Sequence, residues 1–326
     1  MTAVTVRVPA KVNLHLSVGP PRADGYHDLV TVFHAVSLFD EVTVAPADSD
    51  SVVVTGEGAE YVPLDGDNLA ARAARALLSA VGPGCRDSPG MAIQISKRIP
   101  VAAGLAGGSA DAAATLVACN ELWDAGLSQA ELAEVAAQIG SDVAFALLGG
   151  TAIGLGRGER VTPALVTGIY HWVLAFADAQ LSTADVYAAC DRLRGSRGGG
   201  PGQPGRARRP AYAGPAEPPR LNTALMSALR AGDAEEVGEM LSNDLQPAAV
   251  SLLPGLRRTL QAGREHGALG ALVSGSGPTC AYLARDAAHA RELAVALAGA
   301  GVCRTVASVT GPAHGATVVS ERTGSR

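Results

Sequence analysis

The stretch PVAAGLAGGSADAAATL, residues 100–116, joins a glycine-rich loop to an alanine-rich run with strong helix propensity. The preceding residues, MAIQISK (91–97), alternate between apolar and polar side chains and predict a strand. A strand, a glycine loop and a helix start together present free backbone N–H groups and a partial positive charge, which can bind an anion. Gly107 and Gly108 have no side chain to hinder a phosphate, and Ser109 adds a hydroxyl donor or a magnesium ligand. An ordinary glycine turn with a serine cap fits this stretch equally well.

Three common loop motifs do not fit residues 104–111. A Walker A loop would end in Gly-Lys-Ser or Gly-Lys-Thr, and this loop contains no lysine. Its glycines are spaced G-x-x-G-G, unlike the G-x-G-x-x-G of a dinucleotide-binding turn. A hydrolase elbow, G-x-S-x-G, nearly matches GGSAD, but Asp111 stands where its last glycine would be. A serine hydrolase with Ser109 as nucleophile therefore has the wrong elbow, and no histidine and aspartate partners are evident.

The composition indicates a globular protein of about two domains, since domains average roughly 150 residues and the chain has 326. Hydrophobic residues make up 48% and charged residues 17%, which is ample for buried cores. The net charge of −5 gives no support for nucleic-acid binding. No apolar run reaches the ~18 residues of a membrane span, and the first residues lack a signal-peptide block. We therefore expect a cytoplasmic protein with no membrane partner, and its five scattered cysteines should be free thiols.

Local patterns divide the chain into two α+β halves, residues 1–165 and 166–326. In the first half we predict strands at 3–18, 40–47, 51–58, 91–97 and from 151, and helices at 69–81, 109–123, after Ser128 and near Asp142. In the second half we predict strands at 170–177, on both sides of a glycine turn within 270–284, and at 302–310. Helices from Thr183 and at 221–230, 232–241, 249–266 and 286–299 would cover that antiparallel sheet. Residues 195–220, rich in glycine, proline and arginine, predict a mobile surface insertion.

The basic residues are unevenly divided, with 24 arginines and only two lysines, Lys11 and Lys97. A lysine in such a chain suggests a need for a compact ammonium, although chance explains either one equally well. A kinase requires such a cation and a residue that orients the acceptor hydroxyl. Lys11 in PAKVNLHL (9–16) and Asp142 in GSDVAF (140–145) are candidates. Taken singly, Lys11 reads as a solvated turn residue, Asp142 as a helix cap, and VSGSGPT (273–279) as a hairpin turn.

In combination and in this order, three motifs resemble those of the GHMP kinases. They are P-x-K-x-N at residues 9–13, P-x-x-x-G-L-x-G-G-S at 100–109 and S-G-S-G-P at 274–278. That family phosphorylates galactose, homoserine, mevalonate and related small alcohols. The resemblance covers nearly the whole chain, without the 195–220 insertion and the last ten residues. It implies a two-domain α+β fold with a ribosomal-protein-S5-domain-2-like N-terminal domain, a ferredoxin-like C-terminal domain and an active site in the cleft between them.

Five motifs, of which the first extends P-x-K-x-N, resemble one branch of the family, whose acceptor is a cytidine-diphosphate-linked methylerythritol. They are PAKVNLHL (9–16) followed by RADGYHDL (22–29), GSDV (140–143), GGTAIGLGRGE (149–159) and STADVY (182–187). The resemblance implies transfer of the γ-phosphoryl group of ATP to the 2-hydroxyl of this small molecule, with Mg²⁺. It leaves open whether the protein is a monomer or a homodimer.

The resemblance also assigns roles to individual residues. Asp142 matches the base that accepts the hydroxyl proton, and Lys11 lowers the cost of forming the alkoxide. A carboxylate is a weak base for an alcohol, so we expect Asp142 to orient the hydroxyl and take its proton late. On the acceptor side, the matching residues are a stacking and base-reading pair, a second aromatic, a threonine and an asparagine: Tyr26, His27, Tyr187, Thr183 and Asn13.

On the nucleotide side, Asn68 and Lys97 match positions near adenine and ribose, so both lysines would line the site. The loop itself would hold the phosphates through Pro100, Val101, Ala102, Ala103, Gly104, Leu105, Ala106, Gly107, Gly108, Ser109, Ala110 and Asp111. Three positions depart from the commonest form of this loop: Ala106 replaces a glycine, Ala110 a serine and Asp111 an asparagine. Ala106 would be strained at a positive φ. Asp111 places a carboxylate near a polyanion, where it could bind magnesium or a ribose hydroxyl.

Two alternatives to this function are compatible with the same fold. A GHMP kinase for homoserine or mevalonate would have no use for a cytosine-binding DGYH segment (24–27) or for Tyr187. A non-catalytic nucleotide-binding regulator would have no need of Lys11, Asp142 and Ser109 together.

Overall fold

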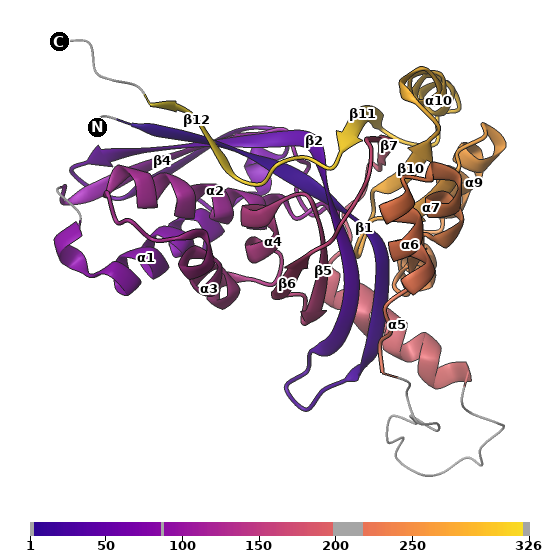
Figure 1. Ribbon diagram of the computed structural model, residues 1–326, viewed down its shortest axis with the longest axis horizontal. Coiled ribbons are helices and arrows are strands. Elements are labelled where there is room, and N and C mark those ends of the chain that lie inside the picture. The colour runs from indigo at the N-terminus through magenta and orange to yellow at the C-terminus, as the bar shows by residue number, and fades with distance from the viewer. Residues whose placement is uncertain (1–2, 86–87, 198–217, 322–326) are drawn as a thin grey trace.

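The computed structural model describes residues 3–85, 88–197 and 218–321, and a long hairpin lies at its centre (Figure 1). The hairpin consists of β1 (Val4–Pro21) and β2 (His27–Ala47), which pair antiparallel. The predicted first strand is confirmed, but only 40–47 of the second strand were predicted. Residues 30–36 are buried on both faces, so their side chains do not alternate between apolar and polar. The hairpin's turn, residues 22–26, projects beyond the body of the sheet.

The larger sheet has eight strands among the described residues, with the central order β12-β1-β2-β4-β3. β5 pairs with β2 and β6, and the short β8 runs parallel to β1. The additional bounds are β3 (Ser51–Gly56), β4 (Gly90–Lys97), β5 (Thr151–Gly156), β6 (Arg160–Pro163), β8 (Ser242–Asn243) and β12 (Thr317–Glu321). The sequence did not predict β12, which returns from the C-terminal half to pair with Val4–Arg7.

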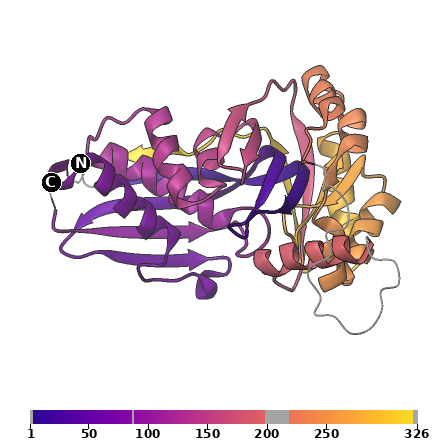
Figure 2. The same cartoon turned by 90° about the horizontal axis from the view of Figure 1, so that it is seen from below.

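The helices of the N-terminal half gather on one face of this sheet (Figure 2). They are α1 (Leu69–Val81), α2 (Gly107–Leu122), α3 (Gln129–Ile139) and α4 (Val143–Leu148), and single 3₁₀ turns occur at Ala59–Tyr61 and Pro83–Cys85. Two predicted helix starts are confirmed: Asn68 Oδ1 accepts from Ala70 N at 2.8 Å, and Ser128 forms a capping box with Glu131. The small alanines of α2 allow it to lie close against β1 and β2, which fixes the start of the helix relative to β1.

The C-terminal half has a second sheet with the order β11-β7-β10-β9, antiparallel throughout as predicted. Its strands are β7 (Tyr170–Phe176), β9 (Gly270–Val273), β10 (Cys280–Ala284) and β11 (Thr305–Gly311). The helices of this half are α5 (Thr183–Arg197), α6 (Thr223–Ala231), α7 (Ala234–Met240), α8 (Gln246–Leu252), α9 (Gly255–Glu265) and α10 (Ala287–Gly299).

Two expectations for this half need correction or restriction. The single helix predicted at 249–266 is wrong, because Pro254 has no N–H and the chain breaks there into α8 and α9. The predicted insertion at 195–220 begins too early, since α5 continues to Arg197, and residues 198–217 lie outside the described part of the chain. All five cysteines are free thiols. Among the described helices, none has the length and apolarity that crossing a bilayer requires.

Candidate active site

The three motifs that are far apart in the sequence meet at the glycine loop. Lys11 N donates to Leu105 O at 3.2 Å, which joins β1 to the loop. Ser274 Oγ donates to Gly104 O at 3.1 Å, which joins the β9–β10 turn to the loop. A Cβ atom at Gly104 would lie 2.2 Å from Ser274 O, and its φ is +77°, so only glycine fits there. The motifs therefore form one continuous wall.

This wall borders a cleft of about 890 Å³, which is lined by residues from both halves of the chain. The predicted residues that line it are Lys11, Asn13, Tyr26, His27, Ala102, Ala103, Gly104, Ala106, Gly107, Gly108, Ser109, Asp142, Thr183 and Tyr187. Seven predicted residues do not line it: Asn68, Lys97, Pro100, Val101, Leu105, Ala110 and Asp111. Among these, the Asn68 side chain caps α1 and donates to Pro63 O at 2.7 Å, so its polar atoms are already bonded.

Lys11 lies on β1 at the floor of the cleft, with only 6% of its surface exposed. Its Nζ donates to Asn13 Oδ1 at 2.5 Å and lies 3.6 Å from Asp142 Oδ2. Asn13 is itself fixed, because its Nδ2 donates to Thr31 Oγ1 at 2.8 Å. Burial lowers the pKa of Lys11, and the attraction of Asp142 only partly opposes this effect. The ammonium is thus dehydrated and held in one position, unlike a solvated turn residue.

Asp142 immediately precedes α4, at the position of a helix cap. Its side chain makes no capping hydrogen bond and instead faces Lys11. The side chain is 28% exposed and lines the cleft, so its carboxylate can be reached by an acceptor hydroxyl. Asp142 therefore occupies a cap position without using its side chain as a cap, and its carboxylate is free to accept a hydrogen bond from a bound molecule.

The glycine loop turns directly into α2. Ala102 and Ala106 have φ values of +53° and +59°, so the strain foreseen for an alanine at position 106 is present. The first backbone bond within the helix is donated by Ala110 N, to Ala106 O at 2.9 Å. The N–H groups of the first helical turn before it have no intrahelical acceptor, and they point out of the helix start. This is the geometry of an anion site.

A buried charged cluster lies directly behind the loop. Lys97 Nζ donates to Asp40 Oδ2 at 2.5 Å and to Asp111 Oδ2 at 2.7 Å, and a Cβ at Gly107 would lie 3.1 Å from this nitrogen. Asp40 Oδ1 also accepts from two backbone amides, whereas Asp111 Oδ1 has no partner among the described residues. Lys97 and Asp111 do not line this cleft, and Lys97 instead supports the loop from behind.

The charges of this cluster influence one another strongly. Burial alone would lower the pKa of Lys97, but Asp111 and Asp40 outweigh it and the pKa is raised. Burial raises the pKa of Asp111 to about 7, against the attraction of Lys97 and with a further contribution from Asp40. Two carboxylates share one ammonium, and burial makes Asp111 easier to protonate than an ordinary aspartate.

The other end of the cleft is aromatic. Tyr26, in the β1–β2 turn, is 55% exposed, and the Arg157 guanidinium lies 4.9 Å from its ring centroid. The His27 and Tyr187 rings are 5.0 Å apart with an interplanar angle of 34°. Burial raises the pKa of Tyr187, which keeps its hydroxyl neutral. These side chains form a recess that suits a flat heterocycle.

Sequence reasoning missed two charged residues of this recess, Arg157 and Asp191. Arg157 lies within the quoted motif GGTAIGLGRGE, where it is the only cation. Asp191 follows Thr183 and Tyr187 at intervals of four on α5, and all three line the cleft. That helical spacing was the available signal, because residues four apart share one face of a helix.

Fold and site agree with the comparisons with known proteins. The model of the GHMP kinases N terminal domain matches residues 68–150, and that of the GHMP kinases C terminal matches residues 225–303. Solved structures with the same fold include a homoserine kinase from Cytophaga hutchinsonii, with a TM-score of 0.69 at 20% identity over 98% of each chain. The chain belongs to the GHMP kinase family and is a kinase.

The more similar relatives carry one particular name within that family. A 4-diphosphocytidyl-2-C-methyl-D-erythritol kinase of Thermobifida fusca is 55% identical, over 98% of this chain and 99% of its own length. The protein of the same name from Mycolicibacterium gilvum is 54% identical, over 97% and 93%. A crystal structure of 4-(cytidine 5'-diphospho)-2C-methyl-D-erythritol kinase is 35% identical with a TM-score of 0.70, covering 94% of this chain and 98% of that one.

Proposed function

We propose that this protein transfers the γ-phosphoryl group of ATP to the 2-hydroxyl of 4-diphosphocytidyl-2-C-methyl-D-erythritol. The products are the 2-phosphate and ADP, and the reaction belongs to non-mevalonate isoprenoid precursor synthesis, in the cytoplasm. The observation that carries the proposal is the single cleft in which the glycine loop, the Lys11–Asp142 pair and an aromatic recess all meet. Full-length relatives at 52–55% identity bear the corresponding name.

The loop residues fit the phosphates of ATP. The amides at the start of α2 supply donors, the helix adds a partial positive charge, and Gly107 and Gly108 leave room for phosphate oxygens. The described residues contain no group of three or more histidine, cysteine, aspartate or glutamate side chains that could hold a metal ion. Mg²⁺ would therefore enter with the nucleotide as MgATP, with Ser109 as the side-chain oxygen at the loop.

The Lys11–Asp142 pair fits the acceptor hydroxyl. Asp142 accepts a hydrogen bond from the 2-hydroxyl and aims its oxygen at the γ-phosphorus. As the new P–O bond forms and the bond to the ADP oxygen breaks, the hydroxyl proton moves to the Asp142 carboxylate. Lys11 lies 3.6 Å away and is poorly solvated, so its charge stabilises the oxygen on which negative charge develops. Asn13 positions that ammonium by accepting its hydrogen bond.

The aromatic recess fits the cytosine. Tyr26 and Tyr187 offer faces for stacking, and His27 offers a ring nitrogen for the base edge. Thr183 Oγ1 is hydrogen-bonded to Ser276 Oγ at 3.0 Å, so the β9–β10 turn and α5 present their hydroxyls together beside the acceptor. Lys97, Asp111 and Asn68 are proposed to act indirectly, by fixing the loop and the start of α1.

The experiment that tests this function measures ADP release by the purified protein with MgATP. The cytidylyl substrate, homoserine and mevalonate are compared with a reaction that contains no acceptor. Release only with the cytidylyl substrate is expected. If ADP is released with homoserine or mevalonate but not with the cytidylyl substrate, the proposed acceptor is wrong. If the protein binds ATP but releases no ADP with any of the three acceptors, a regulatory role is favoured.

A further inference from the structure

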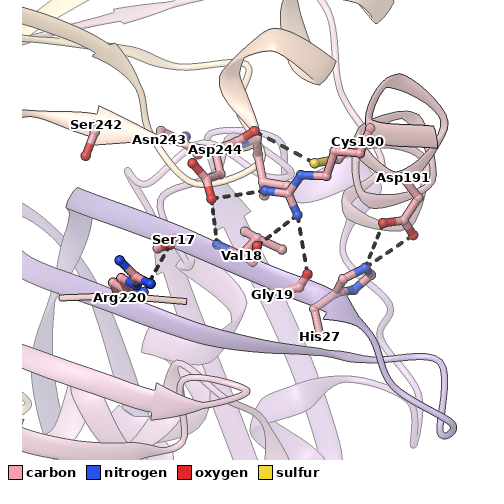
Figure 3. A network of polar contacts seen from close by, with 12 residues as sticks. Ser17, Val18, Gly19, His27, Cys190, Asp191, Arg220, Ser242, Asn243 and Asp244 are labelled. Atoms are coloured by element: carbon pink, nitrogen blue, oxygen red, sulfur yellow. Dashed lines mark hydrogen bonds and ion pairs between the residues drawn. The ribbon is translucent and has the colours of Figure 1, made fainter. Parts of the chain in front are cut away.

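We propose that Asp191 fixes the tautomer of His27 and thereby makes the cleft select cytosine over uracil. This inference rests on the proposed function, since it concerns how the cytidylyl substrate is recognised. Asp191 is a positioning residue in this account, because it acts on the base through His27. Its carboxylate projects from α5 toward His27 (Figure 3). Thr183 and Tyr187 precede it on this helix at intervals of four and line the same cleft.

The contact between the two side chains is well defined. His27 Nε2 lies 3.0 Å from one Asp191 carboxylate oxygen and 3.2 Å from the other. The His27 side chain is 5% exposed, while that of Asp191 is 31% exposed. The Tyr187 ring packs beside the imidazole at a centroid distance of 5.0 Å. The ring of His27 therefore has one orientation, with Nε2 directed at α5.

The carboxylate determines which ring nitrogen of His27 carries the proton. An ionised carboxylate only accepts hydrogen bonds, so Nε2 of a neutral His27 must carry the proton and donate it to Asp191. Nδ1 is then unprotonated and accepts. None of the described residues donates to this nitrogen, and His27 lines the cleft. Cytosine offers an amino group to such an acceptor, whereas uracil offers a carbonyl oxygen at the same place, which would be repelled.

α5 is held in position independently of His27. Arg194 donates to Val18 O at 2.8 Å and to Gly19 O at 3.3 Å, and it also pairs with Asp244 at 3.0 Å. Asp244 Oδ2 in turn accepts from Val18 N at 2.9 Å. These bonds attach the helix to β1 one turn beyond Asp191. A substitution at Asp191 can therefore change the hydrogen bond to His27 while the helix keeps its place.

The test compares Asp191→Asn with the wild type at pH 8, where imidazoles are generally neutral. An asparagine can accept from Nε2–H or donate to a bare Nε2, so both tautomers become available. We measure kcat/KM for the cytidylyl substrate and for its uridylyl analogue, and the Kd of CDP and UDP by calorimetry. The wild type should prefer the cytosine compounds by about 100-fold, the usual penalty for an unpaired polar contact. In Asp191→Asn this preference should fall below about 10-fold, and the change should lie in the KM of the cytidylyl and uridylyl compounds rather than in the KM for ATP.

Two variants serve as controls. Asp185→Asn changes an exposed carboxylate on the same helix that does not line the cleft, and it should keep the wild-type preference. Asp191→Glu keeps an acceptor-only partner and should also retain the preference for cytosine. A purely structural role for Asp191 would weaken both nucleotides equally, and an unchanged CDP/UDP ratio in Asp191→Asn overturns the inference. Nucleotide discrimination without turnover of the cytidylyl substrate would instead refute the proposed function and leave the role of Asp191 supported.

Discussion

Replacing Asp111 by asparagine tests the charged cluster behind the glycine loop. The Asp111 side chain is 4% exposed, and one of its oxygens has no partner among the described residues. Burial raises its pKa from the ordinary 3.8 to about 7. Because the folded-state pKa is the higher one, the contribution of Asp111 to stability is full below pH 4 and is lost as the pH rises through 7.

The magnitude follows from that change in pKa. At about 1.4 kcal/mol for each factor of ten, the loss amounts to about 4 kcal/mol by pH 8, of which about 3 kcal/mol occurs between pH 5 and pH 8. An asparagine can still accept from Lys97 but carries no charge, so it avoids this loss. We expect Asp111→Asn to have a higher free energy of unfolding than the wild type at pH 8, and the advantage should shrink by about 3 kcal/mol at pH 5.

The assay is urea unfolding of both proteins at pH 5, 6, 7 and 8. The difference between them reports on Asp111 together with its partners Lys97 and Asp40, since groups outside this cluster titrate alike in both proteins. His34, whose pKa burial lowers to about 3, is one of those outside groups. Asp48→Asn, at an exposed aspartate on the loop between β2 and β3, is the matched control and should follow the wild type at each pH. If the free energy of unfolding depends on pH in the same way for the wild type and Asp111→Asn, the raised pKa of the buried Asp111 carboxylate is refuted.

Three further substitutions test the cleft. Asp142→Asn should lower kcat by about 10²–10⁴-fold, because the proton acceptor is lost, while the Kd for ATP stays within twofold; wild-type turnover would exclude the role as base. Tyr26→Ala should raise the KM for the cytidylyl substrate about 10-fold with little change for ATP, since one stacking face is lost, and equal effects on both would place Tyr26 outside the cytosine recess. Gly104→Ala should destabilise the protein by more than about 2 kcal/mol in thermal unfolding, because its Cβ would lie 2.2 Å from Ser274 O. Gly126→Ala has a similar φ of +68° but open space around it, and it should cost about 1 kcal/mol; equal losses would show that the contact is unimportant.

Much of the fold follows from local patterns in the sequence. Caps such as Asn68 and Ser128 predict helix starts because their hydrogen bonds are local. The strand at 30–36 could not be recognised, since burial on both faces removes the alternation that identifies a half-buried strand. β12 was also missed: its partner, β1, lies at the opposite end of the sequence, and pairing at such a distance leaves no local signal.

The candidate site shows the same division. The motifs predicted the lining residues where the backbone itself runs along the cleft, as at Gly107 and Asp142. They did not indicate the contacts of Lys97 with Asp40 and Asp111, because a motif position does not reveal on which side of the loop a long side chain lies. Asp191 was missed for a different reason, since its importance depends on His27, a residue of another element.

The pairing of β12 with β1 affects how the chain folds during synthesis. β1 leaves the ribosome well before β12, the neighbour that covers its edge at Val4–Arg7. Until then the nascent sheet has an unpaired edge, which is a template for association with other chains. A ribosome that stalls between β11 and β12 would hold the rest of both sheets with that edge open, so a pause there raises the risk of aggregation.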